Sequence, residues 1–312
     1  MISLDDVIAA RNRIGPYIRS TPMLRAAALK QALPYQNVSL KLECLQVTGS
    51  FKARGAMNRV LGAAPEELKA GLVTASGGNH GLAVARTAHV TGVPATVFLP
   101  SNVSPAKVEK LKGWGARIEI GGKVFDEANE AALAHASQSG ALYVHPYADP
   151  LVVAGQGTLG LDIVDSMPDL DAILIAIGGG GLIAGMATAI KSLRPSVRII
   201  GVEPQGAPTL QASLAAGRVV MLPEITTSVA TMAAQRTDER VFEIARRHVA
   251  EVVLVSDDEM RAAARWLWFE MGIAADLSGA AAIAALQSGR LDLPPEANIC
   301  ALVCGAGPDG IA

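Results

Sequence analysis

The stretch AILIAIGGGGLIAGMATAIKS, residues 172–192, joins a strand pattern to a helix pattern through four consecutive glycines. The apolar run Ala172–Ile177 is typical of a buried strand, and a helical pattern begins near Leu182. Because glycine has no side chain and a helix starts there, the backbone N–H groups of this turn can approach an anion closely. The stretch therefore predicts a strand–turn–helix unit with a phosphate site at the turn.

The glycine turn alone does not identify its ligand. It is not a Walker loop, because no Gly-Lys-Ser/Thr follows the glycines. Gly179, Gly181 and Ala184 fit the dinucleotide pattern G-x-G-x-x-[G/A], and Glu203 stands about 20 residues further on, as that pattern requires. A tight strand–helix contact without any ligand is the third possibility.

Short β-branched runs alternate with helical patterns along the rest of the chain. Strands are expected at residues 38–43, 71–75, 95–99, 117–120, 142–145, 171–177, 197–203, 251–255 and 298–303. Helices are expected after the cap Ser3, from about Ser50, over 79–90, after Ser104-Pro105, up to about 138, over 182–192, and twice between 255 and 298. This alternation predicts an α/β fold with parallel sheets and helices on both faces.

The domain division is expected to follow the strand–helix blocks. Residues 46–145 contain one such block and form the smaller predicted domain. Residues 1–45 together with 146–312 form the larger one. No repeat, low-complexity tract or long linker marks the boundary in the sequence.

Composition and charge exclude several classes of protein. The chain has 312 residues and a net charge of −2, and its 27 basic residues are scattered, so we expect no nucleic-acid partner. No apolar run approaches the roughly 20 residues of a membrane-spanning helix, and the acidic N-terminal sequence does not resemble a signal peptide. The three cysteines, Cys44, Cys300 and Cys304, lack metal-site spacing, so we expect a reducing, cytoplasmic setting.

Two further loops follow predicted strands. The loop SFKARGA, Ser50–Ala56, comes after strand 38–43, and SGGNHG, Ser76–Gly81, comes after strand 71–75. Ligands in open α/β sheets bind at the carboxyl ends of strands. Taken alone, a lysine is usually solvated and a Gly-Gly-Asn segment is usually a turn. Together with the four-glycine turn, however, these two loops make three at strand ends, which indicates one shared site.

With these loops, the sequence resembles the fold-type II pyridoxal-phosphate enzymes, in the serine/threonine dehydratase and serine racemase branch. The matching segments are Thr21-Pro22, Lys41-Leu42-Glu43, SFKARGA, SGGNHG, His145-Pro146, Ala154–Thr158, the four glycines, Gly201–Pro204 and Ser278–Ala280. The resemblance covers nearly the whole chain. It implies a two-domain fold like that of the tryptophan synthase β subunit, with pyridoxal 5′-phosphate in the cleft between a large cofactor-binding domain and a small substrate-loop domain.

The resemblance also implies roles for individual residues. Lys52 matches the Schiff-base lysine, Phe51 packs beside the cofactor ring, and Asn79 bonds to the ring hydroxyl. The phosphate is held by the backbone of Gly178, Gly179, Gly180 and Gly181. The substrate carboxylate is held by the loop of Ser76, Gly77, Asn79 and His80. His80 has an alternative role as a packing residue that does not touch substrate.

Cys304, just after the last predicted strand, matches the position that faces the pyridine nitrogen. A neutral thiol cannot hold that nitrogen protonated as a carboxylate can, so the cofactor is a weaker electron sink. This favours β-elimination over transamination. The alternative is that Cys304 is a buried small hydrophobe, as we expect for Cys44 and Cys300.

Several positions depart from the family pattern. Gly77 replaces the serine that acts as a base in the racemases, which argues against efficient racemisation. The divalent-metal site of this branch matches Glu203, a carbonyl near Ala207, and Thr209 in place of an acid. With one carboxylate fewer, we expect no bound metal, and Glu203 then serves only to cap its strand. Asp276 and the segment 226–236 also differ and leave the side-chain preference open.

The sequence thus predicts a pyridoxal-phosphate-dependent lyase that converts a 3-hydroxy amino acid, L-threonine, L-serine or a relative, to a 2-oxo acid and ammonia. Lys52 would take the Cα proton, since burial can lower a lysine pKa toward neutrality. We expect a homodimer, with a small-molecule substrate and no membrane partner. Three alternatives stay open: a racemase, which Gly77 opposes; a nicotinamide-dependent oxidoreductase, which leaves Lys52 without a role; and a non-catalytic binding protein.

Overall fold

Two mostly parallel sheets form the framework of the protein. The computed structural model describes residues 1–28, 30–101, 103, 105–123 and 125–311. The larger sheet has the order β1-β2-β10-β7-β8-β9, and all of its pairs are parallel except β1 with β2. Its strands are β1 (Met23–Arg25), β2 (Asn37–Leu42), β7 (Ala172–Ala176), β8 (Arg198–Pro204), β9 (Glu251–Val255) and β10 (Asn298–Val303).

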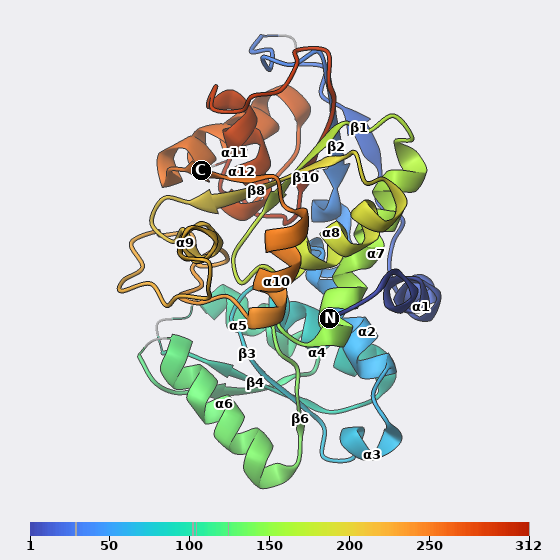
Figure 1. Ribbon diagram of the computed structural model, residues 1–312. Coiled ribbons are helices and arrows are strands. Elements are labelled where there is room, and N and C mark those ends of the chain that lie inside the picture. Colours follow the sequence, from blue (N-terminus) through green and yellow to red (C-terminus); the bar gives the residue numbers. More distant parts are fainter. Residues whose placement is uncertain (29, 102, 104, 124, 312) are drawn as a thin grey trace.

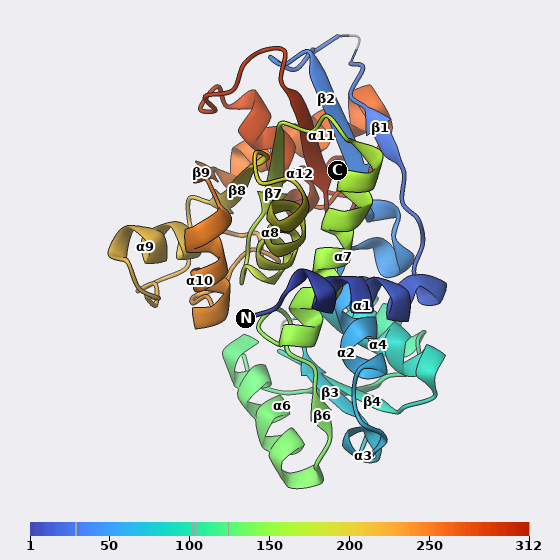
Figure 2. The same ribbon diagram turned by 45° about the vertical axis from the view of Figure 1, so that its right-hand side comes forward.

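The smaller sheet has the order β5-β4-β3-β6 and is parallel throughout. Its strands are β3 (Leu72–Ala75), β4 (Ala95–Leu99), β5 (Arg117–Ile120) and β6 (Leu142–Tyr143). Figures 1 and 2 show it below the larger sheet, with the two joined through helices. The predicted α/β class with parallel sheets is confirmed. The division into residues 46–145 and the rest is compatible with the two sheets and stays a prediction.

Helices cover both faces of the larger sheet and pack around the smaller one. The described helices are α1 (Leu4–Ile14), α2 (Lys52–Leu61), α3 (Pro65–Leu68), α4 (Asn79–Thr91), α5 (Pro105–Lys112), α6 (Phe125–Ser139), α7 (Pro150–Ser166), α8 (Gly181–Leu193), α9 (Thr209–Ala216), α10 (Glu239–His248), α11 (Asp257–Met271) and α12 (Leu277–Gln287). In both views α7 and α8 lie on one side of the larger sheet, and α11 and α12 lie on the other (Figures 1 and 2). None of the described helices is long and apolar enough to cross a membrane.

Local sequence signals explain where several elements begin. Ser3 caps α1, because its hydroxyl accepts the Asp6 N–H while the Asp6 carboxylate accepts the Ser3 N–H. The predicted strands at 95–99, 117–120, 251–255 and 298–303 have the bounds of β4, β5, β9 and β10. The strand predicted at 142–145 is shorter, since β6 ends at Tyr143. The cap predicted at Ser104 lies outside the described residues.

Helix α7 was not predicted, although it stands at the centre of the molecule. Asp149 caps it by accepting the N–H groups of Leu151 and Val152, and Pro150 occupies its first position. Most of its residues are buried, and they lie on all faces of the helix. The sequence of α7 therefore lacks the amphipathic period that identifies a surface helix. A Cβ atom on Gly155 would lie 2.7 Å from Gly55 Cα, so glycines here let α7 pack closely on α2.

Candidate active site

Lys52, the first residue of α2, has a partly buried side chain. Its Nζ donates a hydrogen bond to Pro146 O at 2.7 Å and lies 5.2 Å from the centre of the Phe51 ring. Burial lowers the pKa of Lys52 to about 8, and no carboxylate is among the groups that shift it. An amine without a carboxylate partner is available as a nucleophile or a base.

The glycine turn lies between β7 and α8. Gly180, the N-cap of α8, adopts φ +89°, a left-handed conformation that favours glycine, and no side chain caps the helix. The first N–H groups of a helix have no partner within the helix, so the turn presents backbone donors to an anion. A Cβ atom on Gly179 would overlap the Tyr147 ring, which shows how tightly the turn is packed.

The dipeptide Pro146-Tyr147 brings Lys52 and the glycine turn together. Pro146 O accepts the hydrogen bond of the Lys52 amine, and the next residue, Tyr147, packs against Gly179 and Gly181. Thr237 also supports the turn, because its hydroxyl donates to Gly179 O at 3.1 Å. His145-Pro146 is one of the segments that match the family pattern, but no role was predicted for Pro146 or Tyr147.

The predicted substrate loop lies at the carboxyl end of β3 and leads into α4. Asn79 is the first residue of α4, and no side chain caps this helix, so its first backbone N–H groups are donors for a carboxylate. The Ser76 hydroxyl accepts the Gly78 N–H at 3.2 Å. The Asn79 amide donates to Asp276 Oδ2 at 2.9 Å, which ties this loop to the start of α12.

Asp276 links the loop to Cys304. Its carboxylate also accepts the Ser278 hydroxyl at 2.7 Å and the Gly279 N–H at 2.6 Å, while burial raises its pKa. Cys304 Sγ lies 3.4 Å from Ser278 O, and Cys304 O accepts the Phe51 N–H at 3.2 Å. Burial raises the pKa of the Cys304 thiol, so the thiol is neutral at physiological pH. In the sequence, Asp276 stood out only as a departure from the family pattern. The hydrogen bonds that join it to Asn79 and Ser278 were not predicted.

His80 is buried, and its ring contacts the backbone of Val144, the residue that follows β6. His80 Nε2 lies 2.9 Å from Val144 O, which makes Nε2 the N–H nitrogen, and Nδ1 has no partner among the described residues. Burial, followed by the charge of Lys52, lowers the pKa of His80 to about 3, so its ring is neutral. This placement favours the packing alternative for His80. The predicted contact with substrate stays a prediction.

The sequence suggested that Glu203 caps its own strand. In the structure it instead caps helix α9. Its two carboxylate oxygens accept the N–H groups of Leu210 at 2.7 Å and Gln211 at 2.9 Å, and burial raises its pKa to about 7. The Thr209 hydroxyl donates to the carbonyls of Ala207 and Ala234. Over the described ranges, no group of three or more His, Cys, Asp and Glu side chains is arranged to hold a metal. Because Glu203 is turned into α9, it also cannot bind a ribose as the dinucleotide reading requires.

The residues present fit pyridoxal phosphate. Lys52 offers a desolvated amine for the aldehyde, the glycine turn offers uncapped N–H donors for the phosphate, and Cys304 offers a neutral thiol. These features come from three separate strand ends: the loops after β2, β7 and β10. The hydrogen bonds between Lys52 and Pro146 and between Phe51 and Cys304 hold them at one site.

Comparison with known proteins agrees with this fit. A family model described as pyridoxal-phosphate dependent enzyme matches residues 14–305. An L-threonine ammonia-lyase of Thermotoga maritima is 38% identical over 293 residues, which are 94% of this chain and 73% of that protein. The structure of the processed form of threonine deaminase isoform 2 from Solanum lycopersicum superposes with a TM-score of 0.92 at 34% identity, covering 97% of this chain and 88% of that one. The structure of maize serine racemase gives the same TM-score at 31% identity, covering 97% and 93%.

Proposed function

Because the chain belongs to the family of pyridoxal-phosphate-dependent enzymes, we propose that it is a lyase that dehydrates and deaminates a 3-hydroxy amino acid. The substrate is L-threonine, L-serine or a relative, and the products are a 2-oxo acid and ammonia. The predicted cofactor, pyridoxal 5′-phosphate, and the predicted fold-type II architecture are those of the family and of the structures that superpose on the chain. The relative from T. maritima named for this reaction supports the assignment.

The Lys52 amine carries the proposal. With a pKa of about 8, a far larger fraction of the amines is neutral near pH 7.5 than for an ordinary lysine with a pKa near 10.4. When bound, pyridoxal phosphate supplies an aldehyde and an electron-withdrawing ring. Lys52 then acts as the base that removes the Cα proton, because its amine lies at the site and has no carboxylate partner that would keep it protonated.

The remaining residues position the reactants. We infer that the backbone of Gly178, Gly179, Gly180 and Gly181 binds the phosphate, and that Phe51 packs beside the ring. Asn79 is oriented by its bond to Asp276 and keeps its carbonyl and second N–H for the ring hydroxyl. The loop of Ser76, Gly77, Asn79 and His80 binds the substrate carboxylate. The uncapped N-terminus of α4 supports this last role, since it favours negative charge.

Two features favour elimination over racemisation. Cys304 is neutral and cannot stabilise a protonated ring nitrogen as a carboxylate would. Gly77 offers no acid or base on the face opposite Lys52, so a proton cannot be returned there by a side chain. Racemisation stays the second candidate, because maize serine racemase has such a similar structure.

The setting of the enzyme is also part of the proposal. We infer a homodimer in the cytoplasm with no nucleic-acid partner. The near-neutral net charge of −2 supports the expectation of no nucleic-acid partner. The dimer is supported by Leu24, an apolar side chain that is 42% exposed on the edge strand β1. Light scattering coupled to size-exclusion chromatography measures the mass directly, and a value near 32.2 kDa would contradict the dimer.

The activity is tested by incubating the cofactor-loaded protein with L-threonine, L-serine and related 3-hydroxy amino acids. We expect 2-oxo acid and ammonia in equal amounts. Lys52→Ala should abolish both, while Lys69→Ala, which changes an exposed lysine at the end of α3, should have no effect. A protein that turns over none of these amino acids, or forms D-serine from L-serine faster than pyruvate, would contradict the proposal.

A further inference from the structure

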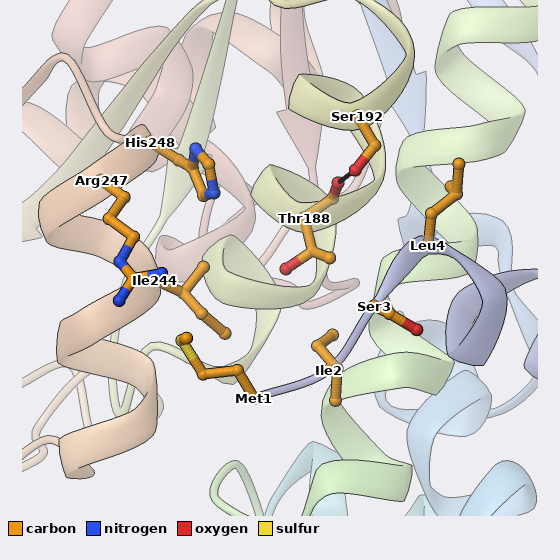
Figure 3. Close-up of a pocket in the computed structure, with 9 residues that line it drawn as sticks. All are labelled: Met1, Ile2, Ser3, Leu4, Thr188, Ser192, Ile244, Arg247 and His248. Carbon is orange, nitrogen blue, oxygen red and sulfur yellow. Dashed lines mark hydrogen bonds between the residues drawn. The ribbon is translucent and has the colours of Figure 1, made fainter.

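A groove lies between the second halves of α8 and α10, and the first residues of the chain form its floor. Figure 3 shows α10 on one side of this groove and α8 on the other, with Met1 and Ile2 below. The cavity has a volume of about 260 Å³. A second cavity of about 190 Å³ shares Met1, Ile2 and Ile244 with it. Sites for drug-sized molecules have roughly 300–1,000 Å³, so this groove suits a smaller ligand.

The lining of the groove combines an apolar floor with a positively charged rim. Ile2, Leu4 and Ile244 supply the apolar part. Arg247 supplies the charge: Glu243, its nearest acid, lies 3.8 Å away and is already paired with Arg246 at 2.8 Å. A carboxylate in the groove would therefore meet a guanidinium that still has free donors.

Neutral polar groups complete the rim. Burial, followed by the charges of Lys191 and Arg247, lowers the pKa of His248, which disfavours the charged form of its ring. The hydroxyls of Thr188 and Ser192 donate to backbone carbonyls one turn earlier in α8. The rim thus carries the Arg247 guanidinium, and no carboxylate stands among its described lining residues, because Asp6 lines only the second cavity and there accepts bonds from Ser3.

Both helices that wall the groove begin at the glycine turn of the active site. Helix α8 starts at Gly181. Helix α10 follows Thr237, whose hydroxyl binds Gly179 O, and its residue Val241 lies so close to the turn that a Cβ atom on Gly180 would be 2.5 Å from Val241 Cγ1. Small sliding of packed helices is one of the known conformational responses of proteins to a ligand. By such a movement, a molecule between the far ends of α8 and α10 would displace the turn at their near ends.

We propose that this groove is an effector site for a small aliphatic carboxylate. The aliphatic chain lies on Ile2 and Ile244, the carboxylate binds Arg247, and occupancy changes the affinity of the glycine turn for the cofactor phosphate. Binding in the groove is independent of the proposed function, whereas the coupling to cofactor affinity rests on it.

Binding is tested by titrating the cofactor-loaded, full-length protein with hexanoate and following its isoleucine methyl resonances by NMR. The resonances of Ile2 and Ile244 should shift and saturate, while Ile173, buried in β7, should not move. Hexylammonium, which has the same chain and the opposite charge, should bind far more weakly. No saturable shift at Ile244, or equal affinity for the two ions, would overturn the site.

Substitutions of charged residues test where the carboxylate of hexanoate binds. Arg247→Gln should weaken hexanoate binding roughly two- to fivefold, the range for an exposed ion pair. Glu243→Gln should strengthen it, because this change removes the acid that competes for Arg247. Arg117→Gln removes an arginine from β5 whose side chain is 76% exposed, compared with 53% for Arg247, and should have no effect. If Arg247→Gln leaves the affinity unchanged, or if Glu243→Gln weakens it, the assignment of the carboxylate to Arg247 is wrong.

The coupling is tested by titrating the apoprotein with pyridoxal phosphate, with and without saturating hexanoate, and measuring absorbance. We expect the cofactor Kd to change at least twofold. Linkage then requires the hexanoate Kd to differ by the same factor between apoprotein and loaded protein. An unchanged cofactor Kd would overturn the coupling. A protein that binds no pyridoxal phosphate would instead contradict the proposed function, while the hexanoate titration would still test the groove.

Discussion

Replacing Arg54 with methionine should destabilise the protein strongly, because it strands a buried carboxylate. Arg54 lies two residues after Lys52, and its guanidinium donates to both oxygens of Glu43, at 2.8 and 2.9 Å, and to Thr158 at 3.0 Å. It also pairs with Asp162 at 2.8 Å. The side chains of Arg54 and Glu43 are 1% and 0% exposed, whereas that of Asp162 is 30% exposed and can be hydrated.

The expected cost follows from the charge left behind. Without Arg54, the Thr21 hydroxyl is the one side-chain donor that Glu43 keeps among the described residues. Breaking a buried ion pair by removing one partner costs about 3–5 kcal/mol. At roughly 2 °C per kcal/mol for a chain of this size, the melting temperature should fall by about 6–10 °C. Calorimetric scans of all variants at one heating rate measure this shift.

Two matched variants separate this explanation from simple loss of packing. Arg54→Met combined with Glu43→Leu removes both charges, so the double variant should melt above the single variant. Arg11→Met breaks an ion pair with Asp165 whose side chains are 43% and 65% exposed, and should cost less than about 1 kcal/mol. The reasoning is refuted if Arg54→Met melts within 2 °C of the unmodified protein, or if the double variant melts below the single one.

Three further changes test the site. Gly179→Ala should weaken cofactor binding severely, because the added methyl group overlaps the Tyr147 ring, and titration of the apoprotein with pyridoxal phosphate gives the Kd. Gly77→Ser should raise racemisation relative to elimination, since the new Cβ needs only a small shift of Val103, 3.0 Å away, and chiral chromatography of L-serine turnover gives the ratio. Chelator should leave activity and melting temperature unchanged, because both oxygens of Glu203 already bind α9.

Each of these expectations has an outcome that contradicts it. Gly15→Ala is the control for Gly179→Ala, because nothing lies within 4 Å of its new Cβ atom, and equal Kd values for the two variants would remove the glycine turn from the cofactor site. An unchanged product ratio in Gly77→Ser would show that position 77 does not set the reaction outcome. Activity that chelator destroys and magnesium restores would show that other oxygens complete a metal site near Glu203.

The elements that the sequence predicted well are those whose burial is periodic or whose ends carry a local signal. Strands such as β9 and β10 are short apolar runs bounded by polar residues, and their bounds were found in the structure as predicted. Helix α7 has no such pattern, because it is buried on nearly every side. Strand β1 is only three residues long and pairs with β2 in the antiparallel direction, so neither length nor alternation marks it.

The candidate site was predictable where one motif contains the chemistry, as SFKARGA and the four glycines do. The contacts that assemble it were not predictable, because they join residues far apart in the chain. Lys52 and Pro146 are 94 residues apart, and Asn79 and Asp276 are 197 apart. Glu203 shows the same limit: its sequence position suggests a metal or a ribose, but its partners, the N–H groups of α9, are set by tertiary packing.

The central claim is that Lys52 carries the cofactor, and borohydride reduction followed by peptide mass spectrometry tests it most directly. The chain contains a buried lysine outside the site, Lys41, whose pKa burial also lowers and whose amine donates to Thr21 O at 2.7 Å. We predict that the reduced cofactor label is found on the peptide containing Lys52 and is absent in Lys52→Ala. A label on Lys41 or on any other lysine, or no label on the yellow protein, would contradict the account.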